Sequence, residues 1–389
     1  MKVLLLQDQV HLPSLGGGNK STRLLLEDLA SRGHECLAIC PALTSRAGPT
    51  SYAELVIEMS KRGVDIRSNS ETCFFYSHND VDVEALSERS PTMLKKHVHD
   101  TIRRFRPDLI LVSDDKRRIL LDCAIQYAPS QVIQIVQTVI HLPFGPLSHH
   151  TSARQTKLMG RARRIFVISD FVRHYIKTYS KLESTVVSLP VYGPGPFNNL
   201  GRFSHGYLTL INPCVEKGLD IFLQLASRLP DSKFAVVPSW GTDDNVIRSL
   251  VSRPNIFIIP PADDLNEVWE QTSILTVPSI WFETFGYVVV EAMLRGIPVV
   301  ASDIGGLPEA KLGVDYLVPV SPAVRRKGKF YNPGQDVEPW LRVLGELLSN
   351  KSAYDHCSSR SQEAASQFLR RSRLDSFSSM LESLGVTRR

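Results

Sequence analysis

The 389-residue sequence has no Cys-x-x-Cys pair, no histidine cluster beside its cysteines, and no apolar run near the ~20 residues that a helix needs to span a bilayer. These absences argue against a zinc site, a disulfide framework and a membrane-spanning helix. The first apolar run, Val3–Leu6, follows a single lysine and is too short for the core of a signal peptide. We therefore expect a cytoplasmic protein. Its six scattered cysteines are expected to be small core residues: Cys36, Cys40, Cys73, Cys123, Cys214 and Cys357.

The net charge is modest, +5, and 22% of the residues are charged, which is ordinary for a globular protein. Three basic clusters lie in the first half: Arg103, Arg104 and Arg106; Lys116, Arg117 and Arg118; Arg161, Arg163 and Arg164. They are interpreted as solvated surface or, alternatively, as a face that attracts an anionic acceptor or gives weak peripheral membrane association. They lack interleaved aromatic residues, so nucleic acid is not an expected partner. The sequence predicts no oligomeric state.

Short apolar runs alternate with helical patterns along the first half. Several of the runs are apolar throughout, which is typical of parallel strands covered on both faces. The helical patterns Ser21–Arg32 and Thr92–Phe105 lie between them. This alternation predicts an α/β fold with a doubly wound parallel sheet. The predicted strands are Val3–Gln7, Cys36–Cys40, Leu109–Ser113, Val132–Val136 and Ile165–Ser169.

A segment rich in Pro, Gly, Asn and Ser, Val191–Gly206, interrupts the pattern and is interpreted as a linker. A second alternating series and a long helical stretch, Tyr354–Leu384, follow it. We expect two α/β domains, 1–198 and 199–369. The predicted strands of the second are Tyr207–Ile211, Lys233–Pro238, Ile256–Pro260, Ile274–Pro278, Pro298–Ala301 and Tyr316–Pro319.

The most informative segment begins where a predicted strand ends, at Pro278. A loop carries Glu283, and a helix is predicted from about Phe285–Gly286 to Arg295, where Gly296 stops it. Ligands of parallel α/β sheets bind beyond the carboxyl ends of the strands. Glu283 is therefore expected at the ligand-binding edge.

The start of this helix suits an anionic ligand. The backbone N–H groups of Phe285, Gly286 and Tyr287 are expected to face a diphosphate, which the helix dipole also favours. Glu291 follows among the apolar residues Val289, Val290, Ala292 and Met293. A carboxylate in such surroundings needs partners, and ribose hydroxyls would supply them.

Three features of this segment together resemble the E-x7-E segment of family 4 glycosyltransferases: Glu283 and Glu291 with Phe285-Gly286 between them, Glu291-Ala292-Met293, and Gly305-Gly306-Leu307-Pro308-Glu309. The resemblance implies a GT-B fold, with two Rossmann-like domains facing across a cleft and a C-terminal helix (about 370–389) that rejoins the first domain. It also implies a retaining transferase that uses a nucleotide-diphosphate sugar, UDP-linked in many members, with no metal or other cofactor. Glu291 would bind the donor ribose, and Glu283 would contact hydroxyls of the transferred sugar. The backbone at Phe285–Tyr287 would hold sugar and phosphate.

A second match is NPCVEKG, residues 212–218, between a predicted strand and a predicted helix. It resembles the family segment in which an Arg is followed, after four residues, by Lys-Gly. The resemblance implies that Lys217, followed by Gly218, holds the donor diphosphate. There its charge would compensate the leaving group. Asn212 stands at the position of the Arg and removes one cation from the expected clamp.

Three further candidates come from strand ends. His141 follows the strand Val132–Val136 and resembles the family histidine, which implies that it contacts the outer hydroxyl of the sugar or the reacting region. The loop that contains Gly16, Gly17 and Gly18, between Leu15 and Asn19, lacks the dinucleotide and Walker patterns. It is either a flexible turn or, as the resemblance implies, a loop that approaches the phosphates or the acceptor. By the same resemblance, Pro260 would line the base pocket through its backbone. Ser169 is interpreted as a structural residue.

Three acidic pairs, Asp114-Asp115, Asp243-Asp244 and Asp263-Asp264, are interpreted as loop or capping residues, so no metal site is predicted.

The predicted function is retaining transfer of a sugar from a nucleotide-sugar donor to a hydroxyl of a small-molecule natural product, a glycan or a lipid. The alternatives are a GT-B epimerase of nucleotide sugars, a disaccharide phosphorylase, and a non-catalytic nucleotide-sugar binding protein. Asn212 keeps the last alternative open.

Overall fold

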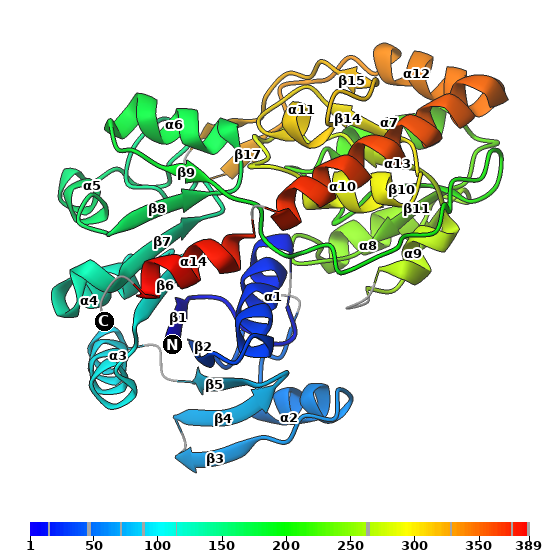
Figure 1. Ribbon diagram of the computed structural model, residues 1–389. Coiled ribbons are helices and arrows are strands. Elements are labelled where there is room, and N and C mark those ends of the chain that lie inside the picture. The colour runs from blue at the N-terminus through cyan, green and yellow to red at the C-terminus, as the bar shows by residue number, and fades with distance from the viewer. Residues whose placement is uncertain are drawn as a thin grey trace. The chain divides into compact units, whose positions relative to one another are not determined.

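The computed structural model describes residues 1–389 except 15, 45–47, 71, 88–89, 114, 262–264, 327–328, 375 and 387–389. The chain forms two compact units, shown with their elements in Figure 1. The first unit comprises Met1–Val191 and Leu374–Arg389, and the second comprises Tyr192–Arg373. The first change of unit thus falls after Val191, at the start of the segment that the sequence analysis interpreted as a linker.

The first unit is built on a nine-stranded sheet with the order β3-β4-β5-β2-β1-β6-β7-β8-β9. The strands from β5 to β9 in this order are parallel, and β1 is central because it pairs with both β2 and β6. Val3–Leu6 of β1 are fully buried, as expected of a strand that is covered on both faces. The strands are β1 (Lys2–Gln7), β2 (Glu35–Pro41), β3 (Arg67–Ser70), β4 (Cys73–His78), β5 (Val81–Leu86), β6 (Leu109–Ser113), β7 (Val132–Val136), β8 (Arg164–Val167) and β9 (Thr185–Val186).

Helices connect these strands. Ser51, Ser152 and Ser169 cap α2, α5 and α6 by accepting a backbone N–H bond at the start of each helix. The helices of the first unit are α1 (Gly17–Ser31), α2 (Tyr52–Ser60), α3 (Pro91–Phe105), α4 (Leu120–Tyr127), α5 (Ala153–Met159), α6 (Asp170–Ser180) and α14 (Phe377–Val386), with a 3-10 turn at Pro129–Gln131.

The sequence analysis missed the edge of this sheet. The strands β3 and β4 are antiparallel, and β4 also runs antiparallel to β5, so the sheet is mixed. The β4–β5 turn is formed by Asn79 and Asp80, which both have a positive φ (48° and 61°). Asn and Asp tolerate this conformation and are typical of tight hairpin turns. The Asn-Asp pair was therefore a signal that the prediction did not use.

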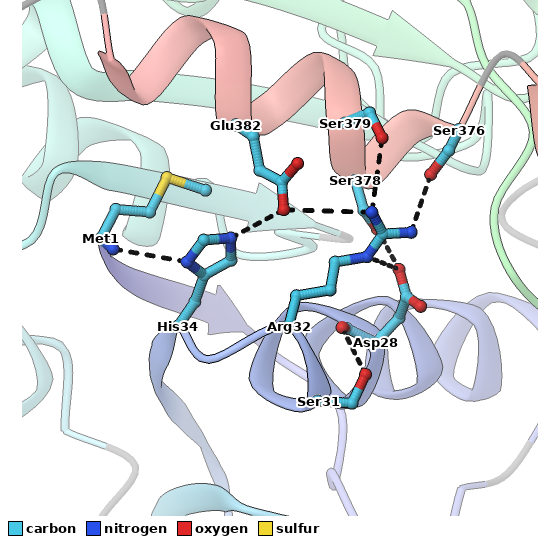
Figure 2. A network of polar contacts seen from close by, with 9 residues as sticks. All are labelled: Met1, Asp28, Ser31, Arg32, His34, Ser376, Ser378, Ser379 and Glu382. Carbon is cyan, nitrogen blue, oxygen red and sulfur yellow. Dashed lines mark hydrogen bonds and ion pairs between the residues drawn. The ribbon is translucent and has the colours of Figure 1, made fainter.

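The helix α14 belongs to the first unit although it is the last helix of the chain (Figure 1). Its Phe377 is buried and packs edge-on against Phe166, with ring centroids 4.8 Å apart. Figure 2 shows the polar contacts that hold α14 on α1 and on the turn between α1 and β2. His34 Nε2 lies 2.9 Å from Glu382 Oε1, and Arg32 donates to the Ser376 and Ser379 hydroxyls at 3.2 and 3.3 Å.

The C-terminal stretch was predicted as one helix, Tyr354–Leu384, and this prediction is wrong. The structure has α13 (Lys351–Leu374) in the second unit up to Arg373, and α14 begins at Phe377. The carbonyl of Ser376 accepts the bond from Met380 N that starts α14. Serine favours helix starts over helix interiors, which explains why the chain restarts its helix here.

The second unit is a six-stranded parallel sheet with the order β12-β11-β10-β13-β14-β15. The chain order reverses between β10 and β13, which is the ligand-binding switch point of a doubly wound sheet. Its strands are β10 (Tyr207–Ile211), β11 (Phe234–Val237), β12 (Ile256–Ile258), β13 (Thr272–Val277), β14 (Val299–Ser302) and β15 (Leu317–Val318), with a separate hairpin of β16 (Val324–Arg326) and β17 (Lys329–Tyr331). Its helices besides α13 are α7 (Leu219–Arg228), α8 (Asp244–Val251), α9 (Asn266–Gln271), α10 (Tyr287–Leu294), α11 (Leu307–Ala310) and α12 (Glu338–Ser349).

All six cysteines are buried. In the part of the chain that the structure describes, no helix combines the length and the apolar character that crossing a membrane requires.

Candidate functional site

Lys217 and Glu283 meet at the switch point of the second unit. Lys217 follows β10 and Glu283 follows β13, the two neighbouring strands between which the chain order reverses. Lys217 Nζ lies 2.5 Å from Glu283 Oε1, and Ser279 Oγ donates to the same oxygen at 2.7 Å. Both charged side chains keep limited access to solvent, 25% for Lys217 and 16% for Glu283. A ligand at this strand edge can therefore reach an ammonium and a carboxylate together.

The two loops that carry this pair are fixed to each other by their backbones. The N–H groups of Ile280 and Trp281 donate to Glu216 O at 3.1 and 3.2 Å. Gly218 has a φ of +77°, and a Cβ at this position would lie 1.8 Å from Pro278 O. Only glycine allows this approach, so both the packing of the loops and the backbone conformation require Gly218.

A second glycine pair supports Glu283 from the β14–α11 turn. Gly306 N donates to Glu283 O at 2.6 Å, and a Cβ on Gly305 would lie 2.4 Å from that oxygen. Gly305 also has a positive φ of +61°. The Gly305-Gly306 pair thus packs closely against the backbone of Glu283 and holds it in place.

Burial and charge act in opposite directions on Lys217. Burial lowers its pKa, but the charge of Glu283 and the hydrogen bond to it outweigh burial, so the pKa is raised above its ordinary value. Lys217 is therefore a cation at neutral pH. A cation at this edge can neutralise the negative charge of a phosphate.

The helix α10 begins next to this pair. Gly286 is its N-cap residue, with φ 109°, and an added Cβ would meet the Leu307 side chain at 2.9 Å. Phe285 and Tyr287 flank it, with ring centroids 5.8 Å apart. Glu291 lies one turn after Tyr287, on the same face of the helix, and is buried. The segment therefore presents a helix N-terminus and a buried carboxylate within two turns.

Asn212 connects the loops that follow β10 and β11 through a hydrogen bond. It directly follows β10 with a φ of +61°, and its Oδ1 accepts from Gly241 N at 2.9 Å. Its Nδ2 is buried and has no partner among the residues that the structure describes. Asparagine tolerates this left-handed conformation better than most residues. The side chain thus links the ends of β10 and β11, and it brings no charge to the site.

Pro260 lies apart from these residues along the sheet. It follows β12, which is the edge strand of the second unit, and it is exposed. Two strands separate β12 from β13, the strand that Glu283 follows. Of the residues predicted in this unit, the structure brings Lys217 and Glu283 into contact and leaves Pro260 outside that contact.

In the first unit, the glycine loop is anchored to a buried polar network. Gly16 is the N-cap residue of α1, with φ 92°, and Gly17 and Gly18 form its first turn. Gly18 O accepts from Gln137 Nε2 at 2.9 Å and from Ser21 Oγ at 2.9 Å. Gln137 directly follows β7, and its Oε1 accepts from Ser21 Oγ at 2.7 Å. This loop lies at the carboxyl ends of the central strands. Leu15 is outside the described residues.

His141 lies in the loop that follows β7 and lines a small pocket. Asp115, Arg118, Gln134, Gln137 and Gln155 supply polar walls of this pocket. Burial, then the positive charges of Lys116, His149 and Arg118, lower the pKa of His141 to about 3. The imidazole is therefore neutral at pH 7, and its Nδ1 has no partner among the described residues. A neutral imidazole can exchange a hydrogen bond with a ligand hydroxyl.

Asp115 and Asp243, one residue from each of two acidic pairs, have structural partners. Asp115 accepts from Ile119 N and Leu121 N at the start of α4, and Asp243 accepts from Val246 N as the cap of α8. Asp114, Asp263 and Asp264 lie outside the described residues. Among the described residues, no group of three His, Cys, Asp or Glu side chains is placed to hold a metal ion.

The sequence analysis did not select Ser279 or Gln137, although each is bonded to a selected residue. Ser279 follows the predicted strand end at Pro278, so its position alone was a usable signal.

The sequence comparisons match part of the chain. Residues 205–328 match the family model described as Glycosyl transferases group 1. Sulfoquinovosyl transferase SQD2 of Arabidopsis thaliana is 26% identical over 155 residues, which cover 40% of this chain and 28% of the relative. D-inositol 3-phosphate glycosyltransferase of Mycobacteroides abscessus is 33% identical over 147 residues, 35% of this chain and 30% of the relative. The chain thus matches less than a third of the length of these relatives.

Solved structures match nearly the whole chain. Sucrose-phosphate synthase from Thermosynechococcus elongatus superposes with a TM-score of 0.66 at 15% identity, over 94% of each chain. Anabaena Alr3699/HepE in complex with UDP-glucose superposes with a TM-score of 0.63 at 17% identity, over 94% of this chain and 95% of that chain. At these identities the likeness is one of fold. It confirms the predicted fold class, the GT-B fold with two Rossmann-like domains.

Proposed function

Because residues 205–328 form a Glycosyl transferases group 1 domain, we propose that this chain is a retaining glycosyltransferase of family 4 that uses a nucleotide-diphosphate sugar. The observation that carries the proposal is the contact of Lys217 with Glu283 at the switch point, next to the N-terminus of α10. A cation and a helix N-terminus suit a diphosphate, and a carboxylate suits sugar hydroxyls. The complex of Alr3699/HepE with UDP-glucose, a protein of the same fold, supports a UDP-linked donor.

In the proposed reaction, the acceptor oxygen forms a bond to the anomeric carbon while the bond from that carbon to the diphosphate oxygen breaks. Negative charge develops on the departing diphosphate, where Lys217 and the first turn of α10 would stabilise it. The diphosphate accepts the acceptor's proton on the same face of the sugar. Glu291 would bind the ribose, and neutral His141 would contact a sugar hydroxyl. The proposal includes no metal ion.

The direct test is a transfer assay with UDP-sugars in the presence of EDTA, followed by NMR of the product. We expect transfer that survives EDTA and a product with the donor's anomeric configuration. Inversion of configuration would refute the retaining mechanism, and complete loss in EDTA that added Mg²⁺ restores would refute metal independence. Loss of activity in Glu283→Ala, with unchanged circular dichroism, would connect the reaction to this site.

Asn212 favours one second candidate, a non-catalytic nucleotide-sugar binding protein. Its carboxamide is engaged with Gly241 and carries no charge, so a diphosphate would meet one cation fewer than in the family pattern. Binding of nucleotide sugars without transfer to any of a broad set of sugar, natural-product and lipid acceptors would support this candidate. Product formation without any acceptor would instead support an epimerase.

The chemistry of the acceptor, weak membrane association and the cytoplasmic location stay predictions. Two residues of the first basic cluster have intramolecular roles, since Arg104 pairs with Glu84 and Arg103 lies over the Tyr127 ring at 5.3 Å. Lys116 and Arg117 are exposed. The second basic cluster is therefore the better place to test attraction of an anionic acceptor or membrane.

A further inference from the structure

Tyr192, the first residue of the second unit, has a hydroxyl group that the fold leaves unused. The residue is 8% exposed, and its OH has no hydrogen-bond partner among the described residues. Buried tyrosine hydroxyls usually find a partner, because an unpaired one costs the protein its lost hydration. An unpaired donor that persists in a binding domain indicates a partner that arrives with a ligand.

The ring of Tyr192 is fixed next to the start of α10. It packs edge-on against Tyr287, with centroids 6.1 Å apart, and against Phe368 at 6.2 Å. Phe285 completes this aromatic cluster, 5.8 Å from Tyr287 and 6.0 Å from Phe368. Two of the four rings therefore flank Gly286, the N-cap residue of α10, and the cluster has little freedom to turn the hydroxyl elsewhere.

The hydroxyl also lies within electrostatic reach of Glu291. Burial raises the pKa of Tyr192 well above its ordinary value, and the charges of Tyr287 and Glu291 raise it further. The phenol therefore stays protonated and can donate. Glu291 is buried on the same face of α10 as Tyr287, one turn later.

We infer that the Tyr192 hydroxyl donates a hydrogen bond to the ribose of the donor nucleotide, beside Glu291. The inference rests on the proposed function and adds a binding residue to it. A ribose diol both donates and accepts hydrogen bonds. A carboxylate only accepts, so a neighbouring phenol supplies the donor that the diol's second oxygen requires. Tyr192 thus gives the site a means to prefer ribonucleotides over their deoxy forms.

The experiment compares full-length wild type, Tyr192→Phe and Tyr354→Phe by calorimetric titration with UDP, GDP and ADP and with the 2′-deoxy and 3′-deoxy forms of the tightest binder. Tyr354→Phe is the matched control, because it also removes a buried hydroxyl of this unit, one that donates to Ser273 O at 2.8 Å. Each substitution by phenylalanine keeps the aromatic ring and removes only the hydroxyl, so the two variants differ only in which hydroxyl is lost.

We expect Tyr192→Phe to weaken binding of the ribonucleotide roughly three- to tenfold, the effect of one hydrogen bond. The variant should bind one of the two deoxy forms, the one that lacks the bonded hydroxyl, as tightly as wild type does. Tyr354→Phe should lower the melting temperature and leave the affinities for the ribonucleotide and both deoxy forms unchanged. Equal affinities of wild type and Tyr192→Phe would overturn the inference and leave the proposed function standing. Equal weakening for the ribonucleotide and both deoxy forms would also overturn it, because the hydroxyl would then act only on the fold. If wild type binds none of the three nucleotides, the proposed function fails and the inference fails with it.

Discussion

Replacing Glu283 by Gln should make the protein bind a nucleoside diphosphate more tightly while it transfers sugar more slowly. In the free protein the ammonium of Lys217 is engaged with the Glu283 carboxylate at 2.5 Å, and that same ammonium is the proposed partner of the diphosphate. A ligand phosphate must therefore compete with Glu283 for Lys217 and must also approach the negative charge of Glu283. The neutral carboxamide removes both obstacles.

The size of the gain follows from the geometry of the pair. Two unit charges at 2.5 Å attract by about 7 kcal/mol at an effective dielectric constant of about 20. Both side chains are partly exposed, so solvent screening and desolvation reduce the net value to about 1–2 kcal/mol. Releasing this pairing should raise the affinity for the diphosphate roughly 5- to 30-fold. The turnover number should fall at least about 100-fold, because Glu283 no longer accepts bonds from the transferred sugar.

The assay is isothermal titration with UDP in EDTA, combined with steady-state transfer kinetics. Lys217→Gln should weaken UDP binding and transfer together. Ser279→Ala is the charge-neutral control, because it removes the other hydrogen bond to Glu283 Oε1 and leaves the ion pair in place. It should leave the UDP affinity within about twofold. If Glu283→Gln binds UDP no more tightly than wild type, Lys217 is not the group for which carboxylate and diphosphate compete, and the reasoning fails.

Three further predictions concern stability, measured by chemical unfolding. Gly218→Ala should destabilise the second unit by several kcal/mol, because its Cβ would meet Pro278 O at 1.8 Å; a native-like melting temperature would contradict this. Burial holds the pKa of His11 at about 3, so the unfolded chain takes up a proton first as the pH falls below about 6.5, and stability is lost between pH 6.5 and 3. Between pH 7 and 4 the free energy of unfolding of His11→Phe should therefore fall by about 3 kcal/mol less than that of wild type. If the two unfolding free energies fall in parallel with pH, the assignment to His11 is refuted. Burial lowers the pKa of Lys311 to about 8, so wild type should gain about 3 kcal/mol as the pH rises from 8 to 10.5, and Lys311→Met should show no such gain.

The sequence predicted the fold where local patterns determine it. Fully apolar runs such as Val3–Leu6 are typical of buried strands of a sheet that is covered on both faces, and the structure confirms this assignment. The antiparallel edge was missed because β4 and β5 form a hairpin whose turn residues, Asn79 and Asp80, were not considered as a turn. The break before α14 was missed because apolar periodicity continues on both sides of Ser376.

The candidate site was predictable to the level of strand ends. The rule that ligands bind at the carboxyl ends of parallel strands selected the neighbourhood of Glu283, and the family resemblance selected Lys217, which lies 66 positions away in the sequence. Their direct contact depends on the pairing of β10 with β13, which no local pattern reveals. The role of Tyr192 could not be predicted for the same reason, since its neighbours Tyr287 and Phe368 lie on helices that are distant in sequence.

The division of the first unit into two separate stretches has a consequence for how the chain is made. A ribosome completes Met1–Val191, then the whole of the second unit, and only then Leu374–Arg389. At 5–20 residues per second, the nascent chain carries the uncovered surface of α1 for roughly 10 to 40 s before α14 arrives to cover it. The apolar contact surface of Phe377 on Phe166 is open during that interval. Translation through the second unit therefore sets the time during which chaperones and proteases can act on the first.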